Sequence, residues 1–186
     1  MTTSVTPIPA TVTPEVFNAA PAAALVDRVA ELFASRTLAA SVVEARPFAS
    51  VDALCAAASD LLRAQDDAGV LESVNAHPPI GGTVAAGSLS AAEQSKAQDS
   101  AQDGDSELQA LRNLQPTYRE KFGWNFLIRA AGRDSRQILD NLVERLAREP
   151  QDEWPTVVDN LDAINQLRLR GFVTEADSEN TKEAQA

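Results

Sequence analysis

Apolar residues return at helical spacing along most of the chain. Between residues 21 and 35 they follow a period of about 3.6, at Leu25, Val26, Val29, Leu32 and Phe33. The same spacing recurs in residues 38–45, 51–62, 68–76, 106–122, 135–148 and 154–172. Alanine and leucine dominate the apolar positions and β-branched runs are scarce, which favours helices over strands. We therefore predict an all-α fold, a single-domain bundle of about seven to nine helices.

Proline, glycine and capping side chains mark the predicted helix ends. The predicted starts are Pro14, Pro21, Ser50, Asp134 or Ser135, and Trp154-Pro155. Pro78-Pro79 stops the helix from Ala68 to Ala76, and Gly123 stops the helix that begins near Ser106. The apolar run from Trp124 to Ala130 is too short for a helix of its own. We expect it to be buried extended backbone whose N–H and C=O groups need partners, and a ligand could be one of them.

The two ends of the chain differ in composition from its middle. Residues 1–13 are rich in Thr and Pro, and residues 174–186 are polar and acidic. We expect both to be disordered tails on either side of a helical domain at residues 14–173. Residues 97–106, rich in Ala, Gln, Asp, Ser and Gly, are predicted to form a poorly packed surface segment.

Charge and composition exclude several classes of function. The chain of 186 residues carries a net charge of -11, whereas binding to nucleic acid or to an anionic membrane surface needs clustered Lys and Arg. No apolar run approaches the roughly 20 residues of a membrane span, so we predict a cytoplasmic protein. The single cysteine, Cys55, excludes an intramolecular disulfide, and with one histidine the chain has no zinc-type cluster, so we expect no metal. Cys55 lies on an apolar helix face and is interpreted as a small buried residue.

Candidate chemistry gathers around His77, the only histidine. The prolines after it end a helix and hold the imidazole on a stiff exit, while Gly81-Gly82 allow backbone to approach closely. Ser90 and Glu93 fit a capping box that opens the next helix, whose first N–H groups suit an anion. A proton-transfer group, a carboxylate and an anion-binding helix start thus fall within about 17 residues.

These residues also have structural interpretations. A solitary histidine is often exposed or satisfied structurally, and Glu93 is fully explained as the N3 residue of the capping box. Arg168 lies on the apolar stripe of the last helix, close to the direction of Leu161, where a guanidinium needs a partner. That partner is either a carboxylate in a buried salt bridge or an anionic ligand, and spacing alone does not separate the two.

With these residues identified, the chain resembles the decarboxylases that act on 2-oxo-4-hydroxy-4-carboxy-5-ureidoimidazoline (OHCU), the last step from urate to (S)-allantoin. The resemblance covers residues 17–172. Its landmarks, in order, are Arg46-Pro47-Phe48, His77-Pro78 with Ile80-Gly81, Ser90 with Glu93-Gln94, residues 118–123 with 126–128, and Leu167-Arg168-Leu169. It implies an all-α homodimer that needs no cofactor and takes a small anionic ureido substrate.

The resemblance also implies roles for individual residues. His77 corresponds to the catalytic histidine, which transfers a proton at the substrate hydroxyl, and Glu93 to its acidic companion. The implied substrate-binding residues are Pro78, Ser90, Gln94, Phe126, Leu127, Ile128, Arg129, Ala130 and Arg168. The chain departs from the family pattern at Asn125, where proline is usual, at Arg129, where a small or apolar residue is common, and in the longer segment at residues 97–106.

Two other functions fit the sequence. One is a non-catalytic helical module that binds a ureide or a partner protein, and the other is a lyase for a related carboxylated ureido compound. The joint presence of His77, Glu93 and Arg168 speaks against the first. Asn125 and Arg129 leave the second open.

Overall fold

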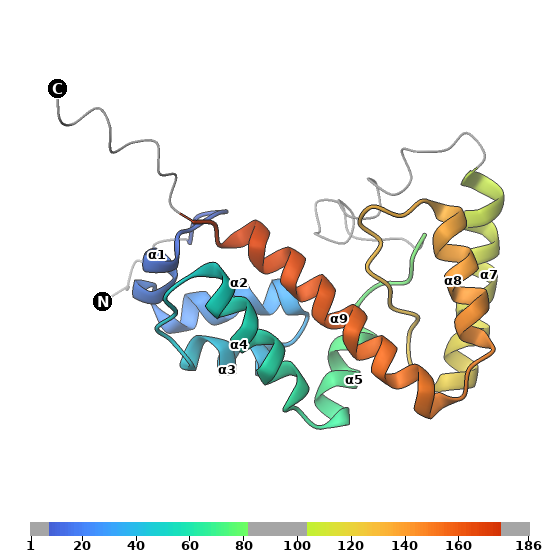
Figure 1. Cartoon of the computed structure of the whole chain (residues 1–186), viewed down its shortest axis with the longest axis horizontal. Helices are drawn as coiled ribbons and strands as arrows, with labels where there is room; N and C mark the ends of the chain where they lie inside the picture. The colour runs from blue at the N-terminus through green and yellow to red at the C-terminus, as the bar shows by residue number, and fades with distance from the viewer. Residues whose placement is uncertain (1–7, 82–103, 176–186) are drawn as a thin grey trace, which may run out of the picture. The chain divides into compact units, whose positions relative to one another are not determined.

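The computed structural model of the chain describes residues 8–81 and 104–175. These residues form eight helices, and the only β-pairing among them is an isolated bridge between Val12 and Val173 (Figure 1). The predicted all-α fold is confirmed. The described residues group into two compact units. The first unit comprises residues 8–64 and 165–175, and the second comprises residues 65–81 and 104–164.

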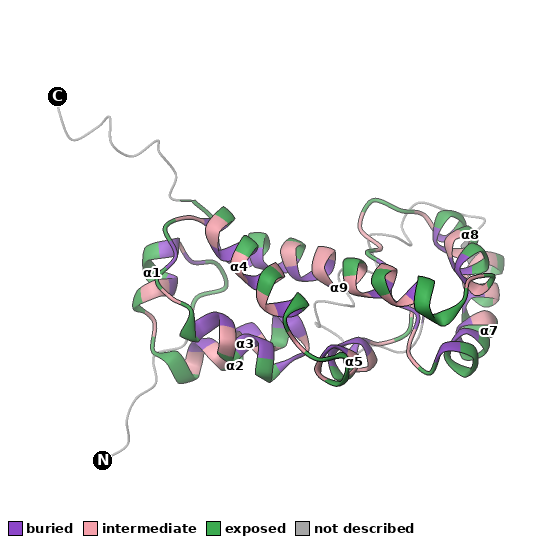
Figure 2. Cartoon of the chain, turned by 60° about the horizontal axis from the view of Figure 1, so that its bottom comes forward, coloured by how far each residue is buried: buried purple, intermediate pink, exposed green. Residues whose placement is uncertain are grey.

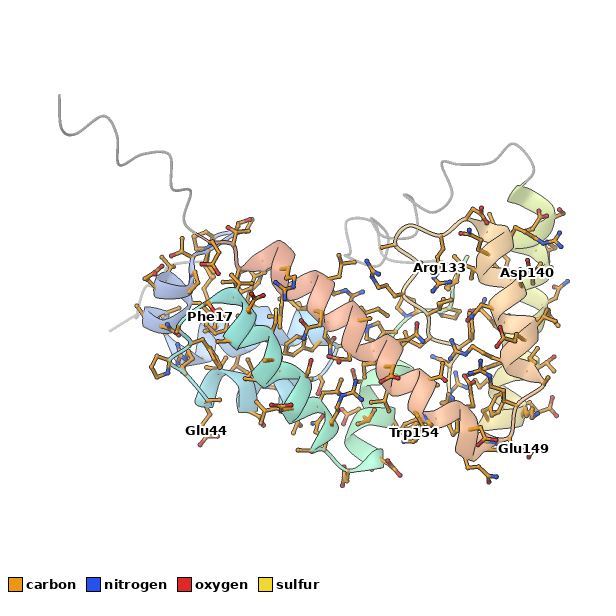
Figure 3. All side chains as sticks on the ribbon, in the orientation of Figure 1. Phe17, Glu44, Arg133, Asp140, Glu149 and Trp154 are labelled. Atoms are coloured by element: carbon orange, nitrogen blue, oxygen red, sulfur yellow. The ribbon has the colours of Figure 1, made fainter. Side chains whose placement is uncertain are left out.

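The first unit contains α1 (Pro14–Ala19), α2 (Ala22–Phe33), α3 (Arg36–Glu44), α4 (Val51–Arg63) and the end of α9 (Pro150–Phe172). Side-chain caps start three of these helices, since Thr13, Ser35 and Ser50 accept hydrogen bonds from backbone N–H groups three residues later. The helices turn their apolar faces inward, as the buried stripes in Figure 2 show. Phe17, labelled in Figure 3, contacts the rings of Phe48 and Phe172 at centroid distances of 6.1 and 6.3 Å.

Arg46 stabilises the connection between α3 and α4. Its Nε donates to the Val43 carbonyl at 2.7 Å, and its Nη1 lies 2.9 to 3.2 Å from the carbonyl oxygens of Phe17, Asn18 and Ala20. These carbonyls lie at the end of α1, where intrahelical donors run out. Arg46 therefore has a structural role in the first unit.

The folded part of the chain extends further at both ends than the sequence predicted. Val12 is 5% exposed, its N–H donates to the Phe172 carbonyl at 2.9 Å, and its carbonyl accepts from Thr174 N–H at 3.0 Å. Glu175 accepts a hydrogen bond from the backbone N–H of Val51 at 2.9 Å. The sequence does not predict this pairing, because a single bridge leaves no periodic pattern of apolar residues.

The second unit contains α5 (Asp67–Ala76), α7 (Gly104–Phe122), α8 (Ser135–Leu146) and the first part of α9. α7 and α8 pack side by side (Figure 1), around a core of Leu111, Tyr118, Phe122, Phe126, Ile128, Ile138 and Leu142. α7 begins at Gly104, so residues 104–106 are helical, although Ser106 is exposed; residues 97–103 of the predicted surface segment lie outside the described residues. α9 begins at Pro150 and not at Trp154, because Pro150 suits a first helical position and Asp152 and Glu153 stabilise the first turn.

Candidate active site

His77 ends α5 in the way the sequence predicted. It is the C-cap residue, with extended backbone (φ -77°, ψ 131°), because the proline that follows disfavours the helical region. Its side chain is 5% exposed, and its ring Nδ1 lies 2.8 Å from the carbonyl oxygen of Ser73. A carbonyl oxygen can only accept, so Nδ1 carries a proton. In the neutral ring Nε2 then holds the lone pair and is the nitrogen that can accept a proton.

α7 holds the loop after His77. The amide of Gln115 makes two hydrogen bonds to the backbone of Ile80, with Oε1 accepting from its N–H at 2.9 Å and Nε2 donating to its carbonyl at 2.8 Å. Arg112 donates from Nε to the Gly81 carbonyl at 2.7 Å. Gly81 has a φ of 71°, a left-handed conformation that favours glycine. Hydrogen bonds from α7 thus fix Ile80 and Gly81, which follow the end of α5.

Asn125 joins the end of α5 to the segment that follows α7. Its backbone N–H donates to Oδ1 of Asn75 at 3.0 Å. Its side-chain Nδ2 donates to the carbonyls of Asn75 at 3.2 Å and His77 at 3.3 Å. Proline at this position could make none of these three bonds, because it has neither the N–H nor the amide. Asn125 therefore connects the backbone at His77 directly to residues 126–130.

The segment of residues 124–130 forms no helix, as predicted, and the predicted burial holds for its centre. Phe126, Leu127 and Ile128 are buried, Ala130 is half-buried and the side chain of Arg129 is exposed. Arg129 N–H donates to Oδ1 of Asn160 at 3.0 Å. Within residues 8–81 and 104–175, the backbone N–H groups of Phe126, Leu127, Ile128 and Ala130 donate no hydrogen bond to the chain. The segment therefore presents backbone donors next to the loop that carries His77.

A buried ion pair between α8 and α9 contacts residues 126 and 127 of this segment. Arg145 and Glu153 are both 0% exposed and 2.6 Å apart, and Arg145 Nη1 donates to the Leu127 carbonyl at 2.9 Å. The guanidinium also lies over the ring of Phe126, 4.7 Å from its centroid. Trp154, labelled in Figure 3, follows Glu153 on α9. Its ring packs edge to face against the ring of Trp124, with 5.0 Å between the centroids. Arg145 thereby fixes both Phe126 and Leu127.

Tyr118 completes the ion pair. Its hydroxyl donates to Oε1 of Glu153 at 2.5 Å and accepts from Nε1 of Trp124 at 3.3 Å. Burial raises the pKa of this hydroxyl well above its usual range; the positive Arg145 opposes that shift, and the Glu153 carboxylate adds to it. Tyr118 therefore stays a neutral donor to Glu153.

A cavity of about 340 Å³ lies beside the loop. Its described lining residues are Pro79, Ile80, Arg112, Gln115, Pro116, Arg119, Asn125 and Phe126. Phe126 is the one predicted site residue among them.

Arg168 belongs to the first unit and is described there by itself. It is 7% exposed, which confirms that it follows the apolar stripe of α9. Its Nη1 donates to the Leu32 carbonyl at 2.8 Å, in the last turn of α2. A cation at a helix C-terminus is favourable, because the last carbonyls carry partial negative charge and lack intrahelical donors.

Comparisons with known proteins identify the family. The model of the OHCU decarboxylase family matches residues 18–170, which include residues of both units. The chain belongs to the OHCU decarboxylase family. It is 31% identical to the 2-oxo-4-hydroxy-4-carboxy-5-ureidoimidazoline decarboxylase of Amia calva over 140 residues, 73% of this chain and 79% of that protein. It is 33% identical to the decarboxylase of the same name from Haloferax volcanii, over 67% of this chain and 73% of that protein.

A solved structure agrees with these relatives. It is a crystal structure of OHCU decarboxylase in the presence of (S)-allantoin, and it aligns with a TM-score of 0.68 and 28% identity. The alignment covers 77% of this chain and 95% of that one. Fold and sequence therefore point to the same family.

The structure describes part of the site predicted for this member of the OHCU decarboxylase family. It brings together His77, Pro78 and the segment of residues 126–130 within the second unit. Ser90, Glu93 and Gln94 lie outside the described residues. Cys55 is buried, as predicted for a packing residue. In the described part of the chain no group of three or more His, Cys, Asp or Glu side chains is placed to hold a metal ion. No helix there is long and apolar enough to span a membrane.

The sequence reasoning missed three residues that shape this site. Arg145 lies seven residues after Ile138 and three after Leu142, on the apolar face of α8, so its spacing could have been read as that of Arg168 was. Gln115 lies four residues after Leu111 on the buried face of α7. Asn125 was seen only as a departure from a pattern, because hydrogen bonds between residues about 50 positions apart leave no local signal.

Proposed function

We propose that this chain is a carboxy-lyase that converts OHCU to (S)-allantoin and carbon dioxide in urate degradation. The observation that carries the proposal is the family match over residues 18–170, which includes His77 in its buried, oriented setting. The relatives named above carry the name of this decarboxylase, and the solved relative was crystallised in the presence of (S)-allantoin.

The reaction is chemically suited to side chains alone. The substrate's carboxylate and a hydroxyl share one ring carbon, next to a carbon that can accept an electron pair. When the bond to the carboxylate breaks, carbon dioxide leaves and its electron pair moves into the ring. The ring nitrogen that receives the electron density is protonated. The hydroxyl then loses its proton to become a carbonyl while the neighbouring carbon gains one, a shift without net change, so that one proton is taken up per turnover. No metal or electron-sink cofactor is required by this scheme.

His77 is assigned to the proton transfer at the hydroxyl. The Ser73 carbonyl fixes Nδ1 as the protonated nitrogen, so Nε2 is the atom that takes the proton from the substrate and returns it. Because His77 is buried at the end of a rigid helix, its ring is oriented before the substrate binds. This preorganisation lowers the cost of reaching the transition state.

The remaining roles follow from the resemblance. Glu93 balances the charge of His77, while Pro78, Ser90 and Gln94 contact the ureido substrate. The segment from Phe126 through Leu127, Ile128 and Arg129 to Ala130 contacts the substrate and offers its oxygens the backbone N–H groups other than that of Arg129, which donates to Asn160. Arg168 binds the substrate carboxylate by charge-assisted hydrogen bonds. We further propose that residues 14–173, together with Val12, Thr174 and Glu175, which hydrogen bonds join to them, act as one family domain. We also propose that the enzyme works in the cytoplasm as a homodimer without a cofactor.

The test is a coupled assay. OHCU is generated freshly from urate with uricase and the hydrolase that follows it, the protein is added, and circular dichroism is recorded. We expect rapid appearance of optically active allantoin, because one face of the carbon is protonated on the enzyme. His77→Ala should abolish this signal while its far-ultraviolet spectrum stays that of the unmodified protein.

The other outcomes are equally definite. Unaltered slow decay of OHCU in the presence of folded protein would overturn the proposal and favour a binding module or a lyase for a related carboxylated ureide. An active His77→Ala protein would leave the reaction but remove the assigned mechanism. Inhibition by a chelator, reversed by one particular metal, would contradict the cofactor-free scheme.

A further inference from the structure

We propose that Asn125, together with Asn75, is a positioning residue that holds the backbone of His77 for catalysis. This inference rests on the proposed function, because it assigns the pair to the residue that moves the proton. Neither asparagine touches the reacting atoms in this proposal. They act by holding the backbone at the C-terminal end of α5.

Two side chains complete the hydrogen bonding at the end of α5. A helix leaves its last carbonyls without intrahelical donors. Here the Val74 carbonyl accepts from the backbone N–H of His77 at 3.3 Å, and the Ser73 carbonyl lies 2.8 Å from His77 Nδ1. The carbonyls of Asn75 and His77 accept from Nδ2 of Asn125. The side chain of His77 and that of Asn125 therefore cap this helix end together.

The amide of Asn125 is held in one orientation. Its Oδ1 accepts a hydrogen bond from Nη1 of Arg119 at 3.0 Å, so the other end, Nδ2, points its two hydrogens toward the two carbonyls. The backbone N–H of the same residue donates to Oδ1 of Asn75 at 3.0 Å. Asn125 thus donates to Asn75 twice, from its backbone N–H to the side-chain Oδ1 and from its side-chain Nδ2 to the backbone carbonyl. The flipped amide would set its oxygen against two acceptors and its NH2 against a guanidinium.

We call the hydrogen bonds from Asn125 to Asn75 and His77 the clamp; they hold the backbone that carries the imidazole. His77 is followed by proline, which has no N–H to donate, so the loop cannot be fixed by its own turn at that point. The clamp fixes the His77 carbonyl on one side, and Gln115 fixes Ile80 three residues later. A shift of the His77 backbone would move the ring together with its bond to the Ser73 carbonyl. A displacement of about 1 Å at a catalytic group can cost about 100-fold in rate.

The sharpest variant is Asn125→Asp. Aspartate has the same shape and still accepts from Arg119, but it replaces the NH2 donor with an oxygen that faces two carbonyl oxygens. We expect kcat to fall by about 100-fold, because the imidazole is displaced from its geometry for proton transfer. KM should change little, because the contacts to the substrate remain. Asn113→Asp is the matched control: it adds the same charge to an exposed residue of α7. Its kcat should equal that of the unmodified protein.

A second pair of variants keeps the inference testable if Asn125→Asp fails to fold. The side chain of Asn75 serves the clamp as an acceptor, through Oδ1. Asn75→Leu should therefore lower kcat, and Asn75→Asp, which keeps the acceptor, should recover most of the loss. A role confined to stability would instead lower the melting temperature of these variants and leave kcat unchanged at temperatures where they are folded.

His77 supplies a readout that does not depend on activity, because it is the only histidine. The Cε1–H group of its ring gives a single signal in the histidine region of a two-dimensional carbon–proton NMR spectrum. That signal should move in Asn125→Asp and stay in place in Asn113→Asp. An unmoved signal together with unchanged kcat would overturn the inference. If the unmodified protein proves inactive on OHCU, the proposed function fails, and the NMR comparison alone then decides whether the clamp positions His77.

Discussion

Tyr118 offers a direct optical test at the level of one side chain. It is the only tyrosine, it is 0% exposed, and burial raises the pKa of its hydroxyl. We expect the near-ultraviolet absorbance of phenolate to appear in concentrated urea around the ordinary value of about 10, and only at clearly higher pH in the folded protein. A spectrophotometric titration measures both. Coincident titration curves at pH values where the protein is still folded would contradict the buried bond to Glu153.

The same residue makes stability depend on pH. Below about pH 10 tyrosine is protonated in both the folded and the unfolded state, so its contribution to stability is complete. Above that value the unfolded chain loses the tyrosine proton and the folded chain retains it. The free energy of unfolding should therefore fall as the pH rises above 10, and Tyr118→Phe should show a shallower fall. Urea unfolding at a series of alkaline pH values checks this.

Two buried arginines show what spacing can predict for a single residue. Arg168 was predicted to follow an apolar stripe and is buried. Arg145 follows the apolar stripe of α8 in the same way, seven residues after Ile138, and it too is buried. Its partner Glu153 lies eight residues later on α9. Nothing in a helical period tells which carboxylate across a turn will face an arginine.

At the scale of elements, the ion pair between α8 and α9 gives a stability prediction. Arg145→Met or Glu153→Leu alone leaves a buried charge without its partner and should cost about 3–5 kcal/mol. The double variant replaces both charges with apolar side chains and should cost clearly less than the sum of the single changes. Urea unfolding of the three variants forms a double-mutant cycle. Strict additivity would show that the pair is not coupled as its 2.6 Å distance implies.

Two glycines at helix ends should respond to alanine with opposite signs. Gly123 follows α7 with a φ of 85°, a conformation that alanine adopts only with strain. Gly123→Ala should therefore lower stability by about 1 kcal/mol. Gly171 lies within α9, and a Cβ there would meet no atom within 4 Å, so Gly171→Ala should raise stability by up to about 1 kcal/mol. Thermal unfolding of the two variants is the comparison, and shifts of the same sign would refute it.

Helix ends were predictable where one residue sets the geometry. Ser50 caps α4, Asp134 caps α8 through a full capping box, and Gly123 ends α7. The start of α9 was placed too late because two prolines, Pro150 and Pro155, compete for the first position and only one occupies it. The segment after Gly123 was predicted as extended and buried. Its partners Arg145, Asn160 and Asn75 come from three other helices and could not be read from its own sequence.

At the scale of the whole molecule, composition was sufficient for the fold class and insufficient for the ends of the chain. Alanine and leucine at helical spacing predicted helices throughout, and helices are what the described residues form. The pairing of Val12 with Val173 joins residues 161 positions apart by two backbone hydrogen bonds. Such pairing depends on where the chain returns after all the helices have packed. Local pattern carries no information about it.

Net charge makes Arg168 the decisive test of substrate recognition for the molecule as a whole. With a net charge of -11, the protein has no diffuse positive field to attract an anion, so recognition must come from local donors. Arg168→Met removes the guanidinium but keeps an apolar side chain of similar length. Loss of its bond to the Leu32 carbonyl should cost about 1–3 kcal/mol of stability. Decarboxylation measured where the variant is fully folded should be nearly abolished. Arg170→Met is the matched control on the same helix, because its ion pair with Asp52 is exposed and contributes little. A folded Arg168→Met protein with the same kcat/KM as the Arg170→Met control would contradict the assignment of Arg168 to the substrate.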